Sequence, residues 1–195
     1  MASVFPTAYF GNVEYFKSLC VHQDCCIETK EHFIKQTIRS RCSILAANGA
    51  MVLSVPVNKT QGSKTPIEKV LLAVDNSWKL EHWRSIKSAY ASAPFFDYYA
   101  YDIESILFND FDSLIELNTA ITKGVISWLN LPVKITFTAE YMADYYDDFR
   151  THAFDSNVAI PKYIQVFPIE NSCHSGLSIL DLLFCEGPLA RKWLL

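Results

Sequence analysis

The stretch SILAANGAMVLSV, residues 43–55, places Asn48 and Gly49 between two apolar runs. Asn-Gly in such a pattern favours a two-residue type I′ turn, because both central residues of that turn need a positive φ. The sequence therefore predicts a β-hairpin that ends at Pro56, since proline has no N–H to donate to a ladder. A polar loop over residues 58–66 and a buried strand over residues 70–74 are predicted to follow.

Helical periodicity dominates the rest of the chain. It predicts helices over residues 78–91, 95–108 and 112–129, and a short helix over 178–185 that stops before Gly187-Pro188. Residues 134–138 are predicted to form a strand, and residues 163–167 a strand or an extended segment. Because strands come first and helices follow, we expect an α+β fold. It would be a single domain over residues 1–195, with the N-terminal hairpin in a sheet packed against several helices.

Composition limits the classes of partner. The chain has 195 residues, half of them apolar, and a net charge of −4, so no basic face is expected to bind nucleic acid. No apolar run reaches the ~18 residues of a membrane span, and the start of the chain does not resemble a signal peptide. We expect a cytoplasmic protein without a cofactor, and its six cysteines to be mostly buried thiols. An oligomer stays open.

His82 is the first candidate for chemistry. On a helical wheel it falls on the apolar side of the segment 78–91, next to Ile86 and Ala89, so it should point inward. Asp75 lies just before this helix and could orient the imidazole as a general base. The alternative is a core histidine held by a hydrogen bond, with Asp75 as a turn or capping residue.

The segment 35–42 is the second candidate. As a strand it would place Lys35, Thr37, Arg39 and Arg41 on one face, where the cations could hold a phosphate or a carboxylate. The alternative is a solvated basic face that keeps the sheet surface soluble.

Three further segments carry polar groups. The loop 59–65 lacks the Gly-Lys pair of a phosphate-binding loop, although it could form a lid. The cluster of residues 20–26 holds Cys and His, but no second pair of ligands follows at a spacing usual for zinc, so we expect no metal site. In the acidic segment 144–150, Asp148 and Arg150 are candidates for the polar wall of a site.

Taken in order along the chain, several motifs resemble the WbqC-like family of bacterial proteins. These motifs are residues 6–10 and 15–16, the run 33–42, residues 53–57, the segment from Val74 through Trp78 and His82 to Phe96, residues 163–167, and LSILDLLF at 177–184 followed by Gly187-Pro188. The chain departs from the family at Ser40 and Cys185, where asparagine is common, and at Gly11-Asn12.

The resemblance implies a role in making surface polysaccharide such as O-antigen. It is consistent with transfer of an acyl or aminoacyl group onto an amino sugar, with His82 and Asp75 as the catalytic pair. The substrate would then be a small molecule, an activated sugar or an acyl donor. The residues expected to bind it are Tyr9, Lys35, Arg39, Arg41, Asp148, Arg150 and Asp181.

Two other classes of function stay open. The chain could be a non-catalytic module that binds a sugar nucleotide or a partner in glycan assembly, with Tyr98, Tyr99, Tyr145 and Tyr146 as stacking surfaces. It could also be a zinc-dependent enzyme that uses the cluster of residues 20–26.

Overall fold

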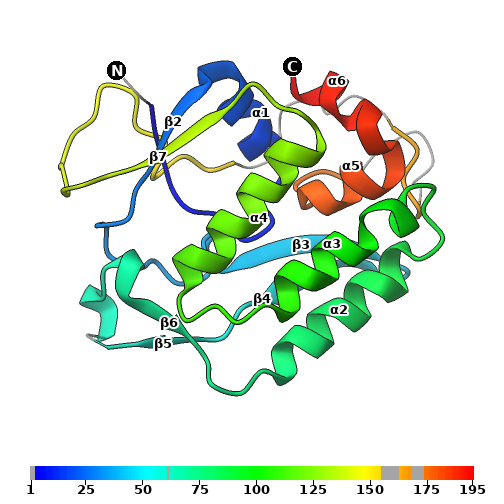
Figure 1. The fold of residues 1–195 in the computed structure, drawn as a ribbon, viewed down its shortest axis with the longest axis horizontal. Coiled ribbons are helices and arrows are strands. Elements are labelled where there is room, and N and C mark those ends of the chain that lie inside the picture. The colour runs from blue at the N-terminus through cyan, green and yellow to red at the C-terminus, as the bar shows by residue number, and fades with distance from the viewer. Residues whose placement is uncertain (1–2, 61, 155–162, 168–173) are drawn as a thin grey trace.

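The computed structural model describes residues 3–60, 62–154, 163–167 and 174–195 (Figure 1). Helices and several small sheets make up an α+β fold, as the sequence predicts. The residues that form the hydrophobic core come from every part of the chain, from Phe5 to Leu194. No helix of the described residues is both long and apolar enough to cross a membrane.

A three-stranded parallel sheet lies at the N-terminal end. Its strand order is β1 (Ser3–Phe5), β2 (Asp24–Ile27) and β7 (Lys134–Phe137), with Val4 opposite Cys26 and Cys26 opposite Thr136. Helix α1 (Val13–His22) connects β1 to β2 and buries one face of aromatic and aliphatic side chains. This helix was not predicted from the sequence, although Asn12 precedes it as an N-cap and accepts a hydrogen bond from the Tyr15 N–H at 2.9 Å.

The predicted hairpin is present as β3 (Arg41–Ala46) and β4 (Gly49–Ser54), paired antiparallel. Its turn differs from the prediction. Ala46 pairs with Gly49, so Ala47 and Asn48 form the loop, and of these turn residues Gly49 alone has a positive φ, 107°. The prediction of a type I′ turn centred on Asn48 and Gly49 is therefore wrong, because such a turn needs a positive φ at both positions.

The hairpin is a sheet of its own and does not join the parallel sheet. A second antiparallel pair follows it, made of β5 (Val57–Lys59) and β6 (Val70–Leu72). Short 3-10 turns at Gly62–Lys64 and Ile67–Lys69 connect these two strands.

The three long helices lie close to their predicted positions. They are α2 (Ser77–Tyr90), α3 (Phe96–Phe108) and α4 (Leu114–Trp128). Ser113 and Glu116 form a capping box at the start of α4, which satisfies backbone N–H groups that a helix end leaves unpaired. In sequence order each of these helices contacts the next, and α2 also contacts β3 (Figure 1).

The chain ends in α5 (Ile179–Glu186), a 3-10 turn (Gly187–Ala190) and α6 (Arg191–Leu194). Ser178 caps α5, and Gly187 ends it with a φ of 57°. A side chain at Gly187 would collide with the ring of Phe95, so glycine is required there for space as well as for conformation.

Two segments considered as strands do not form strands throughout; for residues 163–167 an extended segment was the stated alternative. Residues 35–40 form turns, and the strand begins only at Arg41, so Lys35, Arg39 and Arg41 do not share a strand face. Gln36 has a φ of 61°, which no regular strand accommodates. Residues 163–167 also form no strand. Of the six cysteines, Cys173 lies outside the described residues, whereas Cys20, Cys25 and Cys42 are buried thiols.

Candidate functional site

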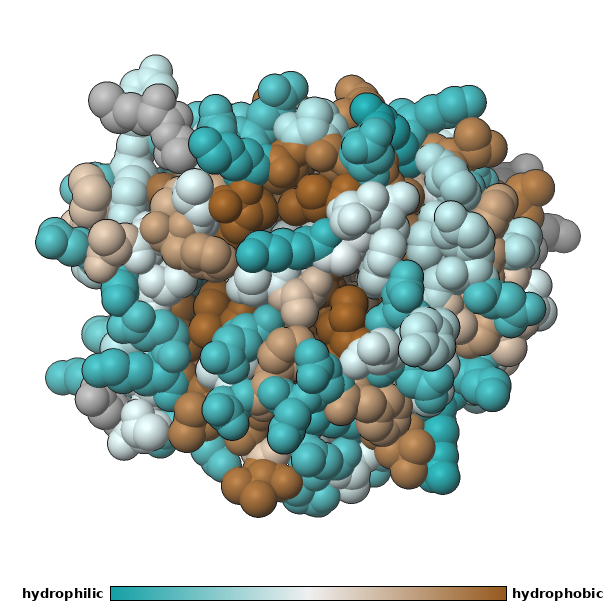
Figure 2. Space-filling model, viewed as in Figure 1, coloured by the Kyte–Doolittle hydropathy of each residue, from teal (hydrophilic) through white to brown (hydrophobic). Residues whose placement is uncertain are grey.

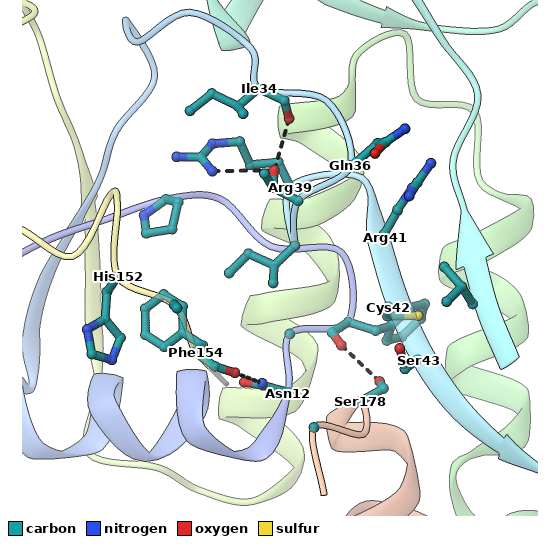
Figure 3. Close-up of a pocket in the computed structure, with 18 of the residues that line it drawn as sticks. Asn12, Ile34, Gln36, Arg39, Arg41, Cys42, Ser43, His152, Phe154 and Ser178 are labelled. Carbon is teal, nitrogen blue, oxygen red and sulfur yellow. Dashed lines mark hydrogen bonds between the residues drawn. The ribbon is translucent and has the colours of Figure 1, made fainter. Parts of the chain in front are cut away.

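A cavity of about 610 Å³ lies where the starts of α1 and α5 meet the hairpin. We call it the Arg41 pocket. Its walls come from the segment before α1, the turns at 34–40, strand β3 and the segment 150–154, which Figure 3 shows surrounding one space. The hydrophilic colour that covers most of the face in Figure 2 is interrupted by apolar surface in its recesses. The polar side chains that line the pocket are Asn12, Gln36, Thr37, Arg39, Arg41, Ser43, Arg150, Thr151, His152 and Ser178.

Two helix N-termini form the floor of this pocket. The Ser178 hydroxyl donates to the Phe10 carbonyl at 2.8 Å, and the Ile179 N–H donates to the Gly11 carbonyl at 2.9 Å. The Asn12 side-chain amide donates to the Phe154 carbonyl (Figure 3). The N-terminal ends of α1 and α5, each of which carries the partial positive charge of its helix dipole, are thus held side by side, which favours an anionic ligand.

Arg41 is the cation of this pocket that has no acidic partner among the described residues. It is half-buried, and its Nε donates only a weak 3.3 Å hydrogen bond to the Ser54 hydroxyl. Arg39, by contrast, is buried, and it forms a bidentate pair with Glu31 at 2.7 and 2.9 Å. The charge of Arg39 is therefore neutralised within the fold, and that of Arg41 is available to a ligand.

Arg150 is the third arginine of the lining, and it too is paired. It binds Asp148 at 2.5 Å and the fully buried Glu28 at 3.2 Å, and the rings of Tyr141 and Tyr145 lie over its guanidinium. These hydrogen bonds hold the pKa of the Asp148 carboxyl below its usual value. Arg150 therefore fixes the segment that forms one wall of the pocket.

His82 points inward, as its place on the helical wheel predicts, and is 5% exposed. Its Nδ1 lies 2.8 Å from the hydroxyl of Tyr9, and the ring of Trp78 packs edge-on against it. Burial lowers the pKa of the imidazole to about 4, so His82 is neutral at pH 7. Asp75 is exposed, and its carboxylate accepts hydrogen bonds from the backbone and hydroxyl of Ser77. Neither His82 nor Asp75 lines the Arg41 pocket.

Asp181 also lies away from the lining of this pocket. It is fully buried, and it accepts hydrogen bonds from the Tyr163 hydroxyl and from Gln165 Nε2. Burial raises the pKa of its carboxyl above the usual value. Gln165 in turn binds the backbone N–H and carbonyl of His174, so Asp181 holds Tyr163 and Gln165 directly and His174 through Gln165.

The remaining predicted residues are dispersed. Lys35 is exposed and lies next to Lys59, which lowers the pKa of Lys59. Tyr9 is buried and does not line the pocket. Cys42 does line the pocket, but burial raises the pKa of its thiol and leaves it protonated. Among the described residues, no group of three or more His, Cys, Asp and Glu side chains is placed to hold a metal ion.

Several lining residues were not predicted as site residues from the sequence, among them Asn12, Ser43, His152 and Ser178. Asn12 and Ser178 carried a usable signal, because both are N-cap types that directly precede an apolar helical pattern. Ser43 and His152 carried no such sequence signal, because their places in the pocket depend on contacts between distant parts of the chain.

The comparisons with known proteins give one match. The model of the WbqC-like protein family matches residues 7–165, which include most of the pocket lining. No curated protein and no solved structure matches the chain. Because the match extends over most of the sequence, the chain belongs to the WbqC-like protein family.

Proposed function

We propose that this protein takes part in making surface polysaccharide and binds an anionic, activated sugar in the Arg41 pocket. The observation that carries the proposal is Arg41 itself, a cation without an acidic partner in the described structure, beside two helix N-termini. A phosphate or diphosphate would satisfy both features at once. The family membership and the resemblance described above supply the polysaccharide context.

The rest of the lining suits a sugar. Amide and hydroxyl side chains such as Asn12, Gln36 and Ser43 can both donate and accept, which matches the hydroxyl groups of a carbohydrate. The exposed side chains of Ile34 and Val52 add apolar surface. A volume of about 610 Å³ lies within the range of small-molecule sites, roughly 300–1,000 Å³.

The reaction that we propose is transfer of an acyl or aminoacyl group to an amino sugar. His82 as its base remains part of that proposal, because its imidazole is neutral at pH 7, although a pKa of about 4 makes it a weak base. However, its Nδ1 is bound to Tyr9, and it is buried outside the pocket lining. This burial favours the second candidate function, a non-catalytic module that binds a sugar nucleotide.

The binding proposal is tested with inorganic phosphate, uridine diphosphate and a uridine diphosphate sugar as probes, measured by calorimetry. A charge-assisted contact contributes ~1.5–3 kcal/mol, so Arg41→Gln should weaken diphosphate binding roughly 10- to 100-fold. Arg84→Gln, which removes an exposed arginine of α2 outside the pocket, should leave it unchanged. Equal affinities of wild type and Arg41→Gln, or no binding of any probe, would overturn the proposal.

The two candidate functions are separated in cells that lack the chromosomal copy. His82→Gln keeps a hydrogen-bonding group beside Tyr9 but removes the imidazole. If this variant folds, binds the probe and restores no surface polysaccharide, His82 is catalytic. If it restores the polysaccharide fully, the catalytic role of His82 is refuted.

A further inference from the structure

We propose that His152, positioned by Glu14, is the base of this transfer in place of the buried His82, and that it accepts a proton from the ligand held in the Arg41 pocket. This inference rests on the proposed function, because it assumes that the pocket binds a substrate. In Figure 3 the side chains of Arg41 and His152 lie on opposite sides of the pocket. An elongated ligand with its phosphates at Arg41 would therefore present its other end to His152, as a nucleotide sugar does.

The ring of His152 is held in place although it is accessible. It packs edge-on against Phe154 and Phe149, with ring centroids 4.9 and 5.7 Å away, and its backbone N–H donates to the Phe149 carbonyl at 3.1 Å. Its side chain is still 44% exposed and lines the pocket. A proton acceptor needs this combination of fixed geometry and access.

Glu14 supplies the carboxylate that such an imidazole requires. It lies in the first turn of α1, its side chain is only 16% exposed, and its Oε1 is 3.8 Å from His152 Nε2. Its Oε2 is buried and has no hydrogen-bond partner among the described residues. An unsatisfied buried carboxylate oxygen is costly, and a positive charge on His152 would stabilise it.

Other charged groups around His152 are engaged elsewhere. The Arg150 guanidinium is turned toward Asp148 and Glu28. His22, which also packs against the Phe149 ring, lies 3.5 Å from Asp147. Glu14 is therefore the acid that faces the His152 ring, and because it faces Nε2, the nitrogen left for the ligand is Nδ1.

In the transfer that we propose, the acyl donor is a thioester. The amine nitrogen of the sugar attacks the thioester carbon, a C–N bond forms and the C–S bond breaks. His152 Nδ1 takes the proton that leaves the nitrogen and passes it to the departing thiolate, so the histidine ends neutral. Glu14 stabilises the imidazolium between these steps, which makes it a positioning residue.

The pairing is tested first by the NMR spectrum of the His152 imidazole. Removing the facing carboxylate with Glu14→Gln should shift the ring resonances of His152, because Glu14 Oε1 lies 3.8 Å from its Nε2. The ring resonances of His32, an exposed histidine outside the pocket, should not move. Unchanged His152 resonances would overturn the pairing, whatever the pocket binds.

The chemical role is tested with His152→Gln, beside His32→Gln as the matched control. In cells lacking the chromosomal copy, His152→Gln should not restore surface polysaccharide, and with purified protein a positioned base contributes ~10²–10⁴-fold to the transfer rate. A melting curve should show that the variant is folded at the assay temperature, and its affinity for uridine diphosphate should equal that of wild type, because Arg41 holds the phosphates. Full restoration by His152→Gln would overturn the proton-accepting role. If the wild-type protein does not bind uridine diphosphate, the proposed function is overturned instead. The two failures are distinguishable, because the first is read as restored polysaccharide and the second as absent diphosphate binding.

Discussion

The wild-type protein should lose stability in mild acid because of His82, and the substitution His82→Gln should abolish this pH dependence. His82 has a pKa of about 4 in the folded chain against an ordinary value of 6.5, because burial penalises its charged form. Between these values the unfolded chain binds a proton that the folded chain does not. The free energy of unfolding therefore falls as the pH drops below about 6.5, and this contribution stops changing below about pH 4.

The size of the effect follows from the gap between the folded and unfolded pKa values. A gap of one between two pKa values corresponds to ~1.4 kcal/mol, so the titration of His82 removes about 3 kcal/mol between pH 6.5 and pH 4. Glutamine can still bond the Tyr9 hydroxyl, but it loses the ring contact with Trp78, which should destabilise the variant by roughly 1–2 kcal/mol at pH 7. The variant should thus be less stable than wild type at pH 7, and equally or more stable at pH 4.

The measurement is urea unfolding at several pH values between 7 and 4, followed by tryptophan fluorescence. Trp78 lies 5.2 Å from the His82 ring, so its emission should also report the titration directly. Burial raises the pKa of Asp181 and hydrogen bonds from Arg150 lower the pKa of Asp148, but both groups are present in wild type and variant, so their contributions cancel in the difference between the two proteins. The reasoning would be refuted if the difference in free energy of unfolding between wild type and variant stayed constant from pH 7 to pH 4. A His82 resonance that titrates near pH 6.5 would refute it too.

Three other substitutions test how the fold is held, each by the same unfolding assay. Arg150→Ala should cost about 3–5 kcal/mol, because it leaves the buried carboxylate of Glu28 without its partner, and a loss below 1 kcal/mol would contradict a buried pair. Gly187→Ala should cost at least about 2 kcal/mol, since alanine is strained at a φ of 57° and its Cβ meets the Phe95 ring. Ser113→Ala should cost about 1 kcal/mol through loss of the capping box, whereas alanine at an exposed mid-helix serine should cost almost nothing.

The long helices could be predicted from the sequence because local signals agree with the tertiary structure there. Helix α4 has an apolar stripe and a capping box within its own first residues, so its start needs no knowledge of distant partners. Helix α1 was missed although Asn12 marked its start, and its last three residues, 20–22, were considered only as part of the Cys- and His-containing cluster of residues 20–26. The hairpin was predicted correctly, but its turn is shifted by one residue, which a short loop tolerates when glycine follows it.

The failure at residues 35–40 has a different cause. Alternation of charged and apolar residues predicted a strand, but the side chain of Arg39 is drawn into the fold by Glu31, and that partner is not marked in the sequence. Of the cations predicted to bind a substrate, Arg41 emerges in the pocket without an acidic partner among the described residues, and Arg39 and Arg150 emerge there as paired charges. The spacing of residues along the chain can predict that an arginine lies near a site. It does not show which of the arginines is neutralised by an acidic residue from elsewhere in the fold.

The hydrogen bonds that hold the N-terminal ends of α1 and α5 together also determine when the pocket can form during synthesis. Ser178 bonds the carbonyls of Phe10 and Ser43 through its hydroxyl and its backbone N–H, across more than 130 positions of sequence. A nascent chain that has released only its first 170 residues holds one of the two helix ends, so it has no closed floor on which a phosphate can rest. Because contacts of such long range form late, diphosphate binding should appear only after the C-terminal helices have left the ribosome, and it would report completion of the fold.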